Sequence, residues 1–133
     1  MKIGDYIRTY DGFIAKLIDI EENLYTFDNT VFLSNDEYQS KIIDLYEDEL
    51  KSAKKKTSRY LIDLIELGDY VLVQGEDTFL QVKYIDTCEG CMRELYFTED
   101  GMDMGYWNEQ IKAVIPKEQI NSITYKVNDF RFK

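Results

Sequence analysis

A short motif occurs twice in this chain and constrains its architecture more than any other feature. Residues 3–7 read IGDYI, and residues 67–71 read LGDYV. In each copy the glycine lets the chain turn, and the aspartate can bond to its own backbone just past the turn, after which a strand begins. Turn chemistry explains Gly4, Asp5, Gly68 and Asp69 fully. The repeat therefore predicts duplicated folding units and not duplicated active sites.

The match between the two copies continues beyond the motif with small gaps. The aligned pairs are Phe13-Ile14 with Phe79-Leu80, Ile18-Asp19 with Ile85-Asp86, and Leu24-Tyr25 with Leu95-Tyr96. Each copy therefore reads as a turn, a strand, a hairpin and a second strand. The Asp-Gly pair at residues 11–12 is a strong signal for the first hairpin, and residues 74–79 predict a longer loop in the second copy.

The residue types favour strands. Eleven tyrosines and seven phenylalanines with a single proline suit a pleated, half-buried surface. Helical signals are confined to residues 46–55, where acids precede bases, to an apolar turn at residues 62–65, and to residues 116–120. We therefore predict a mostly β, β-rich α+β fold: two similar small antiparallel SH3-like barrel units, packed together because units of about 60 residues are marginal alone. One sandwich of two similar halves is the alternative.

The charge distribution marks the boundary between the units. Residues 1–50 hold twelve acidic and four basic residues, residues 51–59 hold five basic and no acidic residues, and residues 60–133 hold fourteen acidic and seven basic residues. We predict an N-terminal β unit at residues 1–50, a basic helical linker at 51–60 and a C-terminal β unit at 61–133.

Enzymatic chemistry has little support in this sequence. The chain has no histidine, which excludes a Ser-His-acid hydrolase. It has no P-loop or cofactor motif either. Cys88 and Cys91 have C-x-x-C spacing, but a zinc site needs four ligands, so we predict two reduced cysteines in a turn and no metal site in a monomer. The acids of residues 99–103 lack the ligand spacing of a calcium loop. We predict a non-enzymatic protein without cofactors.

The net charge of −10 favours a basic protein as the partner, since an acidic surface repels nucleic acid. The candidate partner-binding acids, which cluster in predicted loops or exposed turns, are Glu47, Asp48, Glu49, Glu76, Asp77, Glu99, Asp100 and Asp103. Tyr106 and Trp107 are candidate apolar anchors if exposed. Burial in the core is the favoured interpretation of Trp107, because the single tryptophan of a small β unit is more often buried.

Membrane and secretion signals are lacking. No apolar run approaches the roughly 20 residues of a membrane helix, and the first residues do not resemble a signal peptide. We expect a soluble cytoplasmic protein with no membrane partner.

Three segments carry a resemblance to a known family. Residues 61–71 (LIDLIELGDYV), the opening residues 1–20 and residues 111–127 resemble a family of small acidic proteins, with repeated Gly-Asp-Tyr motifs, from Firmicutes and their phages and other mobile elements. Many relatives have Asn-Gly after the second motif, where this chain has residues 72–75 (LVQG). The resemblance implies a phage or mobile-element setting. It implies no activity and no catalytic motif, so no functional residue is carried over.

These observations lead to two functional hypotheses. The first is a non-enzymatic acidic module that binds a basic protein, for example an anti-CRISPR-like inhibitor that mimics nucleic acid in the positive groove of an RNA-guided nuclease. The alternative is a small-barrel module that binds nucleic acid through Lys51, Lys54, Lys55, Lys56 and Arg59. The net charge argues against the alternative.

Overall fold

The computed structural model describes residues 1–32, 38–76, 78–87, 93–98 and 105–119. These residues form antiparallel β-sheets with a single α-helix and short 3-10 helices, which confirms the predicted mostly-β class. No helix within these ranges is long and apolar enough to cross a membrane. The sheets are open, and the part of the chain that is described contains no closed barrel, so SH3-like barrel units are not seen.

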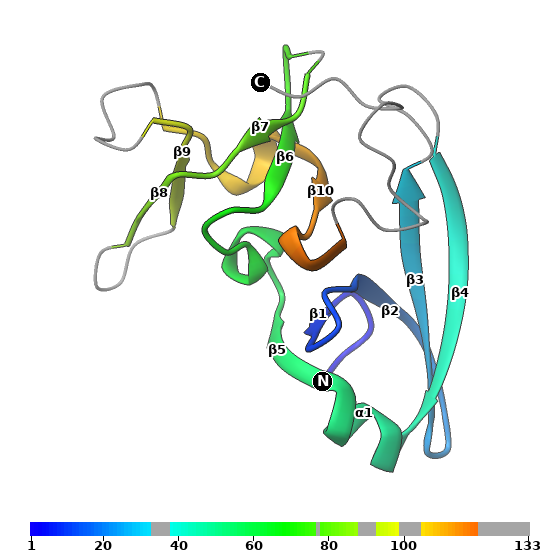
Figure 1. Ribbon diagram of the computed structural model, residues 1–133. Helices are drawn as coiled ribbons and strands as arrows, with labels where there is room; N and C mark the ends of the chain where they lie inside the picture. The colour runs from blue at the N-terminus through cyan, green and yellow to red at the C-terminus, as the bar shows by residue number, and fades with distance from the viewer. Residues whose placement is uncertain (33–37, 77, 88–92, 99–104, 120–133) are drawn as a thin grey trace.

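The larger sheet lies in the N-terminal half of the molecule (Figure 1). Its strand order is β4-β3-β2-β1-β5, with β1 at Tyr6–Thr9, β2 at Ile14–Glu21, β3 at Leu24–Phe32, β4 at Tyr38–Tyr46 and β5 at Lys54–Ser58. Helix α1 (Glu47–Ala53) connects β4 to β5 and buries Leu50. Leu50 packs with Ile7, Leu17 and Phe27 to form the core of this half.

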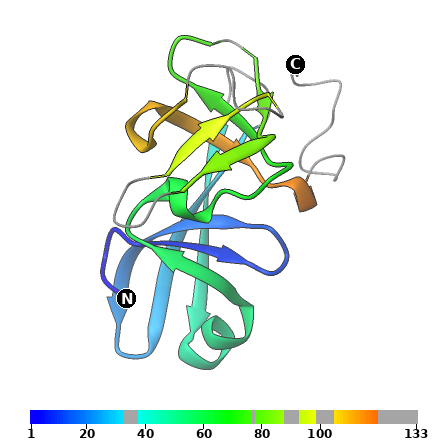
Figure 2. The ribbon, with the colours of Figure 1, turned by 90° about the vertical axis from the view of Figure 1, so that its left-hand side faces the viewer.

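The C-terminal half contains two smaller sheets. One has the order β10-β6-β7, with β6 at Tyr70–Val73, β7 at Leu80–Gln81 and β10 at Ile111–Ile115. The other pairs β8 (Tyr84–Asp86) with β9 (Glu94–Tyr96). The 3-10 helices are η1 (Leu61–Leu64), η2 (Asn108–Gln110) and η3 (Lys117–Gln119). Figure 2 shows the five-stranded sheet below and these smaller sheets above.

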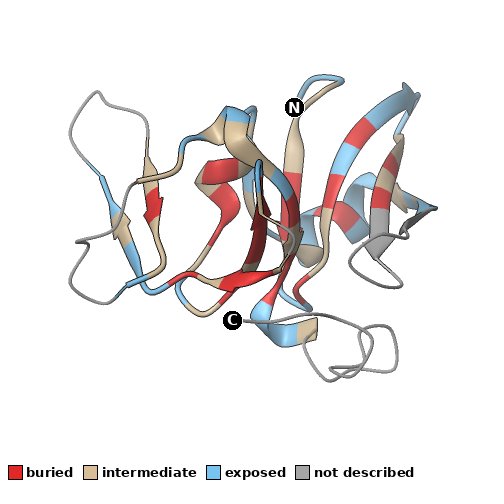
Figure 3. Ribbon diagram, turned by 90° about the horizontal axis from the view of Figure 1, so that it is seen from above, coloured by how far each residue is buried: buried red, intermediate tan, exposed pale blue. Residues whose placement is uncertain are grey.

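Helix η1 joins the two halves. The predicted apolar turn is present: Ile62, Leu64 and Ile65 are buried. Ile62 and Ile65 belong to the second core with residues of β6, β7 and β9, among them Val71, Leu80 and Leu95. Figure 3 shows the buried residues concentrated in the strands and in this connection, toward the middle of the molecule.

The two Gly-Asp motifs fold alike. Gly4 and Gly68 both have a positive φ, of 100° and 93°, which explains the need for glycine at each turn. Each glycine N–H donates to a carbonyl, that of Leu17 in β2 in the first copy and that of Val82, directly after β7, in the second, at 2.8 and 2.9 Å. Both turns therefore launch a strand, β1 or β6, into an antiparallel pair.

The strand register changes one detail of the sequence alignment. Ile7 lies opposite Ala15 in the first pair, and Val71 lies opposite Leu80 in the second. Leu80 is thus equivalent to Ala15, whereas the sequence alignment pairs Leu80 with Ile14, the residue before it. The loop before β7 is therefore one residue longer than the first hairpin, and not two as the sequence alignment implies.

The basic segment at residues 51–60 is not the predicted helical linker. Only Lys51–Ala53 lie in α1, and the next five residues form β5, which pairs with β1 through Tyr6↔Ser58 and Ile7↔Thr57. An extended segment here satisfies the backbone groups along the free side of β1, which a helix would leave unpaired. The segment therefore completes the first sheet.

Candidate protein-interaction site

The β2–β3 turn, the end of β4 and the start of α1 meet at one end of the five-stranded sheet. The backbone N–H of Glu47 donates to the carbonyl of Asn23 at 3.0 Å, which holds the start of the helix against the turn. Seven exposed acids gather there: Asp19, Glu21, Glu22, Asp44, Glu47, Asp48 and Glu49. We call this group the acidic end.

The carboxylates of the acidic end have few partners. Among the described residues, their single ion pair joins Lys51 Nζ to Glu47 at 3.9 Å, and both side chains are largely exposed. Glu49 Oε1 accepts a hydrogen bond from the Tyr46 N–H at 3.1 Å, and Asp44 accepts one from the Thr26 hydroxyl at 2.7 Å. The acidic end therefore presents excess negative charge to the solvent.

Local structure explains why the fold can place these negatively charged side chains close together. Glu47, Asp48 and Glu49 form the first turn of α1, where the helix dipole and the free N–H groups favour negative charge. Glu22 occupies the tight turn with a φ of 56°. Water and dissolved ions around these exposed side chains screen the repulsion between the carboxylates.

The predicted acids have different fates. Glu47, Asp48 and Glu49 lie together, and they are joined by Glu21 and Glu22, which are not among the predicted acids. Glu76 is half-buried in the C-terminal half, far along the chain from the acidic end. The remaining four, Asp77, Glu99, Asp100 and Asp103, lie outside the described residues.

Tyr106 and Trp107 differ in exposure. Tyr106 is half-buried, exchanges backbone hydrogen bonds of 2.9 Å with Leu95, and packs its ring 5.3 Å from that of Phe97. Trp107 is 53% exposed, so the interpretation of Trp107 as a core residue is wrong. The backbone N–H of Trp107 donates to Gln110 Oε1 at 2.9 Å at the start of η2. In this turn the indole side chain points outward.

A buried ion cluster, which the sequence analysis missed, joins the two halves. Arg8 in β1 is fully buried, and its guanidinium forms a bidentate pair with Asp69, which is also fully buried. Arg8 also donates to Glu118 Oε2 at 2.8 Å and to the Leu64 carbonyl at 3.0 Å. Its Nε lies 3.4 Å from Glu66 Oε2, an ion-pair contact.

Lysines neutralise the outer side of this cluster. The Glu66 carboxylate lies 3.0 Å from Lys55 Nζ, 3.6 Å from Lys56 Nζ and 3.2 Å from Lys117 Nζ. Burial alone would raise the pKa of Glu66, but the hydrogen bonds from Lys55 and Lys117 and the charge of Arg8 outweigh it and lower that pKa to about 2. Burial of Arg8 likewise opposes its charge, yet Asp69 holds its pKa above the ordinary value.

We call this set the Arg8 cluster: Arg8, Glu66, Asp69 and Glu118 with Lys55, Lys56 and Lys117. It places four cationic groups against three carboxylates, and the Asp69 carboxylate also accepts the backbone N–H groups of Glu66 and Lys117 at 2.8 and 2.9 Å. Pairing of each carboxylate with a cation of the same chain indicates a structural role, since these contacts join the two halves. The repeat contains a signal for the burial of Arg8. Arg8 aligns with Leu72 in the second copy, and Leu72 is a buried apolar residue.

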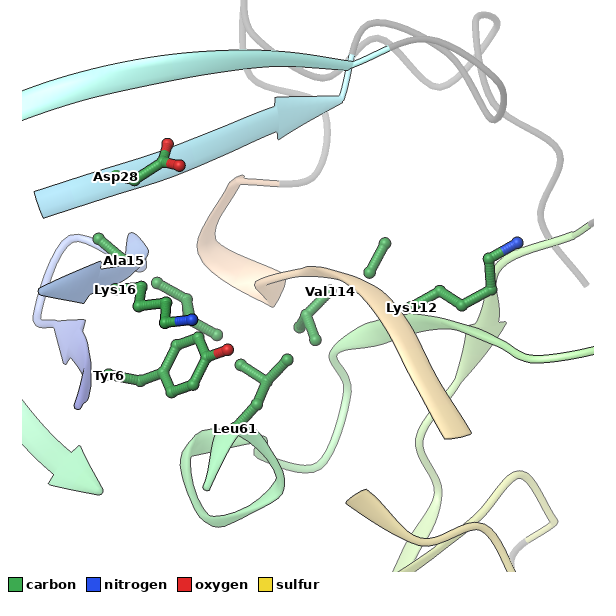
Figure 4. A pocket seen from close by; sticks show the side chains of 9 residues that line it. Tyr6, Ala15, Lys16, Asp28, Leu61, Lys112 and Val114 are labelled. Carbon is green, nitrogen blue, oxygen red and sulfur yellow. The ribbon is translucent and has the colours of Figure 1, made fainter. Parts of the chain in front are cut away.

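A cleft of about 200 Å³ separates the five-stranded sheet from β10 (Figure 4). Tyr6, Lys16 and Asp28 line it on the sheet side, and Leu61 and Val114 line it opposite. Lys16 Nζ lies 5.8 Å from the centroid of the Tyr6 ring, and Asp28 Oδ1 is buried without a hydrogen-bond partner among the described residues. The lining of the cleft therefore combines apolar side chains with charged ones.

The basic segment is largely neutralised by the fold. Lys55 and Lys56 pair with Glu66, and Lys51 pairs with Glu47. Three of the five bases that could contact nucleic acid therefore face carboxylates of the same chain. This arrangement lowers the positive potential that phosphate binding needs.

Comparison of this chain with protein-family models, with curated proteins and with solved structures found no match.

Proposed function

We propose that this protein is a non-enzymatic binding module whose acidic end engages a basic macromolecular partner. The observation that carries the proposal is the gathering of seven exposed acids from β2, β4, α1 and the intervening turn, with Lys51 as their one ion-pair partner among the described residues. The carboxylates of the Arg8 cluster, by contrast, are engaged within the fold.

Many acids acting together are needed for affinity. A single exposed salt bridge contributes about 0–1 kcal/mol, so one or two contacts would not hold a partner. Seven carboxylates on one end also create a field that steers a positively charged surface toward them, which raises the association rate at low salt. Exposed Trp107 offers a second contact site, an aromatic anchor outside the acidic end.

The partner we propose is a protein with a nucleic-acid-binding groove, such as an RNA-guided nuclease of a bacterial host. These grooves are strongly positive, and an acidic surface can occupy them in place of nucleic acid. The family resemblance, with its phage or mobile-element setting in the host cytoplasm, supports this choice. The matching turns at Gly4 and Gly68 support the related proposal that both halves derive from an SH3-like barrel unit.

Direct nucleic-acid binding through residues 51–59 is the alternative. We rank it second because Lys55 and Lys56 are paired with Glu66 and are less available to phosphate groups. The deciding experiment is a salt-titrated binding measurement against a candidate RNA-guided nuclease and against free DNA and RNA. We expect binding to the nuclease that weakens steeply as salt rises, because steering is screened over about 8–10 Å. Tight association with nucleic acid alone would overturn the proposal and promote the alternative.

A further inference from the structure

The two edges of the five-stranded sheet differ in how they are protected. The β5 edge is five residues long and begins with Lys54, Lys55 and Lys56. The β4 edge is nine residues long, with one lysine, Lys41, and no described strand pairs with its outer side. Edge strands offer unpaired N–H and C=O groups to other chains, and short length or lysines normally block this pairing. β4 therefore lacks the protection that β5 has.

The two faces of β4 have different chemistry. Side chains alternate along a strand, so Lys41, Ile43 and Leu45 share one face. That face continues an apolar groove of about 260 Å³, which Ile7, Ala15 and Phe27 also line.

The opposite face of β4 is exposed and carries one carboxylate, that of Asp44. Asp44 lies in one row with Thr26 and Asp19 on the neighbouring strands. Ile42 and Tyr46, on either side of Asp44, are 56% and 55% exposed. An added strand would thus meet an apolar surface on one face of the sheet and a carboxylate between two apolar side chains on the other.

We infer that the outer edge of β4 binds an extended segment of the basic partner as a sixth strand of the sheet. This inference rests on the proposed function, since the segment belongs to the same partner. Main-chain hydrogen bonds supply general affinity in such strand addition, and alternate side chains supply specificity. The segment that fits has apolar residues facing Ile43 and Leu45 and a basic residue opposite Asp44.

Charge complementarity favours a basic partner over a second copy of this chain. A second copy would bring another net charge of −10 to the same edge. A basic segment would instead neutralise Asp44 and extend along β4 toward Glu47 and Asp48, which directly follow the strand. The acidic end would then attract the basic side chains of the added strand where it passes the end of β4, and those of the residues that follow it.

A nine-residue peptide of alternating lysine and valine, with blocked termini, is a suitable probe. We expect amide hydrogen exchange to slow in β4 when the peptide binds, and not in β5 or β10. Two N-methylated forms give a matched pair, because methylation of alternate residues blocks one edge of the peptide strand. The form methylated on the pairing edge should bind at least about tenfold more weakly, while the other should stay within about twofold.

A matched pair of variants locates the site on the protein. Ile42→Lys on β4 and Ile18→Lys on β2 both replace an exposed isoleucine by lysine and change the net charge equally. We expect Ile42→Lys to weaken peptide binding at least about tenfold and Ile18→Lys to weaken it no more than about threefold.

Each outcome decides something. Equal binding of the two methylated peptides, protection outside β4, or no binding of the peptide would overturn strand addition. Protection of β4 without peptide, together with the mass of a dimer, would assign the edge to a second copy. A third result would separate the two proposals. If the peptide protects β4 equally at high salt and after charge reversal of Glu21, Glu22 and Asp48, strand addition is supported and the proposed function is overturned.

Discussion

The acidic end and the Arg8 cluster contain the same kind of side chain in opposite settings. Asp69 is fully buried and accepts hydrogen bonds from Arg8, Glu66 and Lys117. Asp48, on the first turn of α1, is exposed and forms no ion pair among the described residues. The contrast teaches that the number of acids in a sequence does not locate a site. Burial and counter-charges decide which carboxylates hold the fold and which remain available to a partner.

The two Gly-Asp turns make the same point within a single motif. Asp5 Oδ2 accepts the Lys2 N–H at 2.8 Å, and Asp69 Oδ2 accepts the Glu66 N–H at the same distance. Only Asp69 has an added role, because Arg8 from the other half of the chain reaches it. Asp5 thus stabilises only its own turn, whereas Asp69 stabilises its turn and also the contact between the two halves.

The largest expected effect comes from Asp69→Ala compared with Asp5→Ala. Asp69→Ala leaves Arg8 buried without its main partner, which typically costs about 3–5 kcal/mol of unfolding free energy. Asp5→Ala removes one exposed turn hydrogen bond, worth about 0.5–1.5 kcal/mol. Urea unfolding of both variants measures the difference. Equal losses would show that Asp69, like Asp5, contributes only to its turn.

The second expected effect is a pH dependence of the unfolding free energy that is caused by Glu66. Its pKa is near 2 in the folded protein against 4.5 ordinarily, so its charged form stabilises the fold above about pH 4.5. That contribution is lost as the pH falls toward 2, and it is on the order of 2–3 kcal/mol. Unfolding free energies of the natural protein and Glu66→Gln should therefore differ at pH 6 and converge near pH 2. A gap that persists at pH 2 would contradict this.

The smallest effect on stability is expected at the acidic end. The triple variant Glu21→Lys, Glu22→Lys, Asp48→Lys retains the Glu49 hydrogen bond to Tyr46 and the Glu47–Lys51 pair. Its unfolding free energy should stay within about 1 kcal/mol of the natural protein, because the three replaced side chains are exposed and have no ion pair with the residues that the structure describes. Thermal and urea unfolding test this, and a loss as large as that of Asp69→Ala would mean that the acidic end also holds the fold.

Sequence reasoning succeeded where the signal was local. Positive φ at Gly4 and Gly68, the hairpin at residues 11–12 and the buried turn at Ile62–Ile65 all follow from short-range chemistry. The exposure of the three acids of α1 follows for the same reason, since they are consecutive in the sequence and share one turn.

Contacts between distant segments were beyond that reasoning. Arg8 and Asp69 are 61 residues apart, and no short-range pattern links them. Residues 54–58 were predicted to be helical from their charges, but the free side of β1 draws them into a strand. Trp107 was assigned to the core by composition, whereas the turn before η2 decides its direction. Tertiary context overrode local preference at each of these positions.

The central claim is that the acidic end, and not net charge in general, binds the basic partner. The direct test measures the affinity of the alternating lysine–valine peptide, at one low salt concentration, for the natural protein and two triple variants. One variant is Glu21→Lys, Glu22→Lys, Asp48→Lys; the control is Glu76→Lys, Asp86→Lys, Glu109→Lys, which reverses three acids of the C-terminal half. We predict at least about tenfold weaker binding for the first and no more than about threefold for the control. Equal weakening in both would contradict the claim.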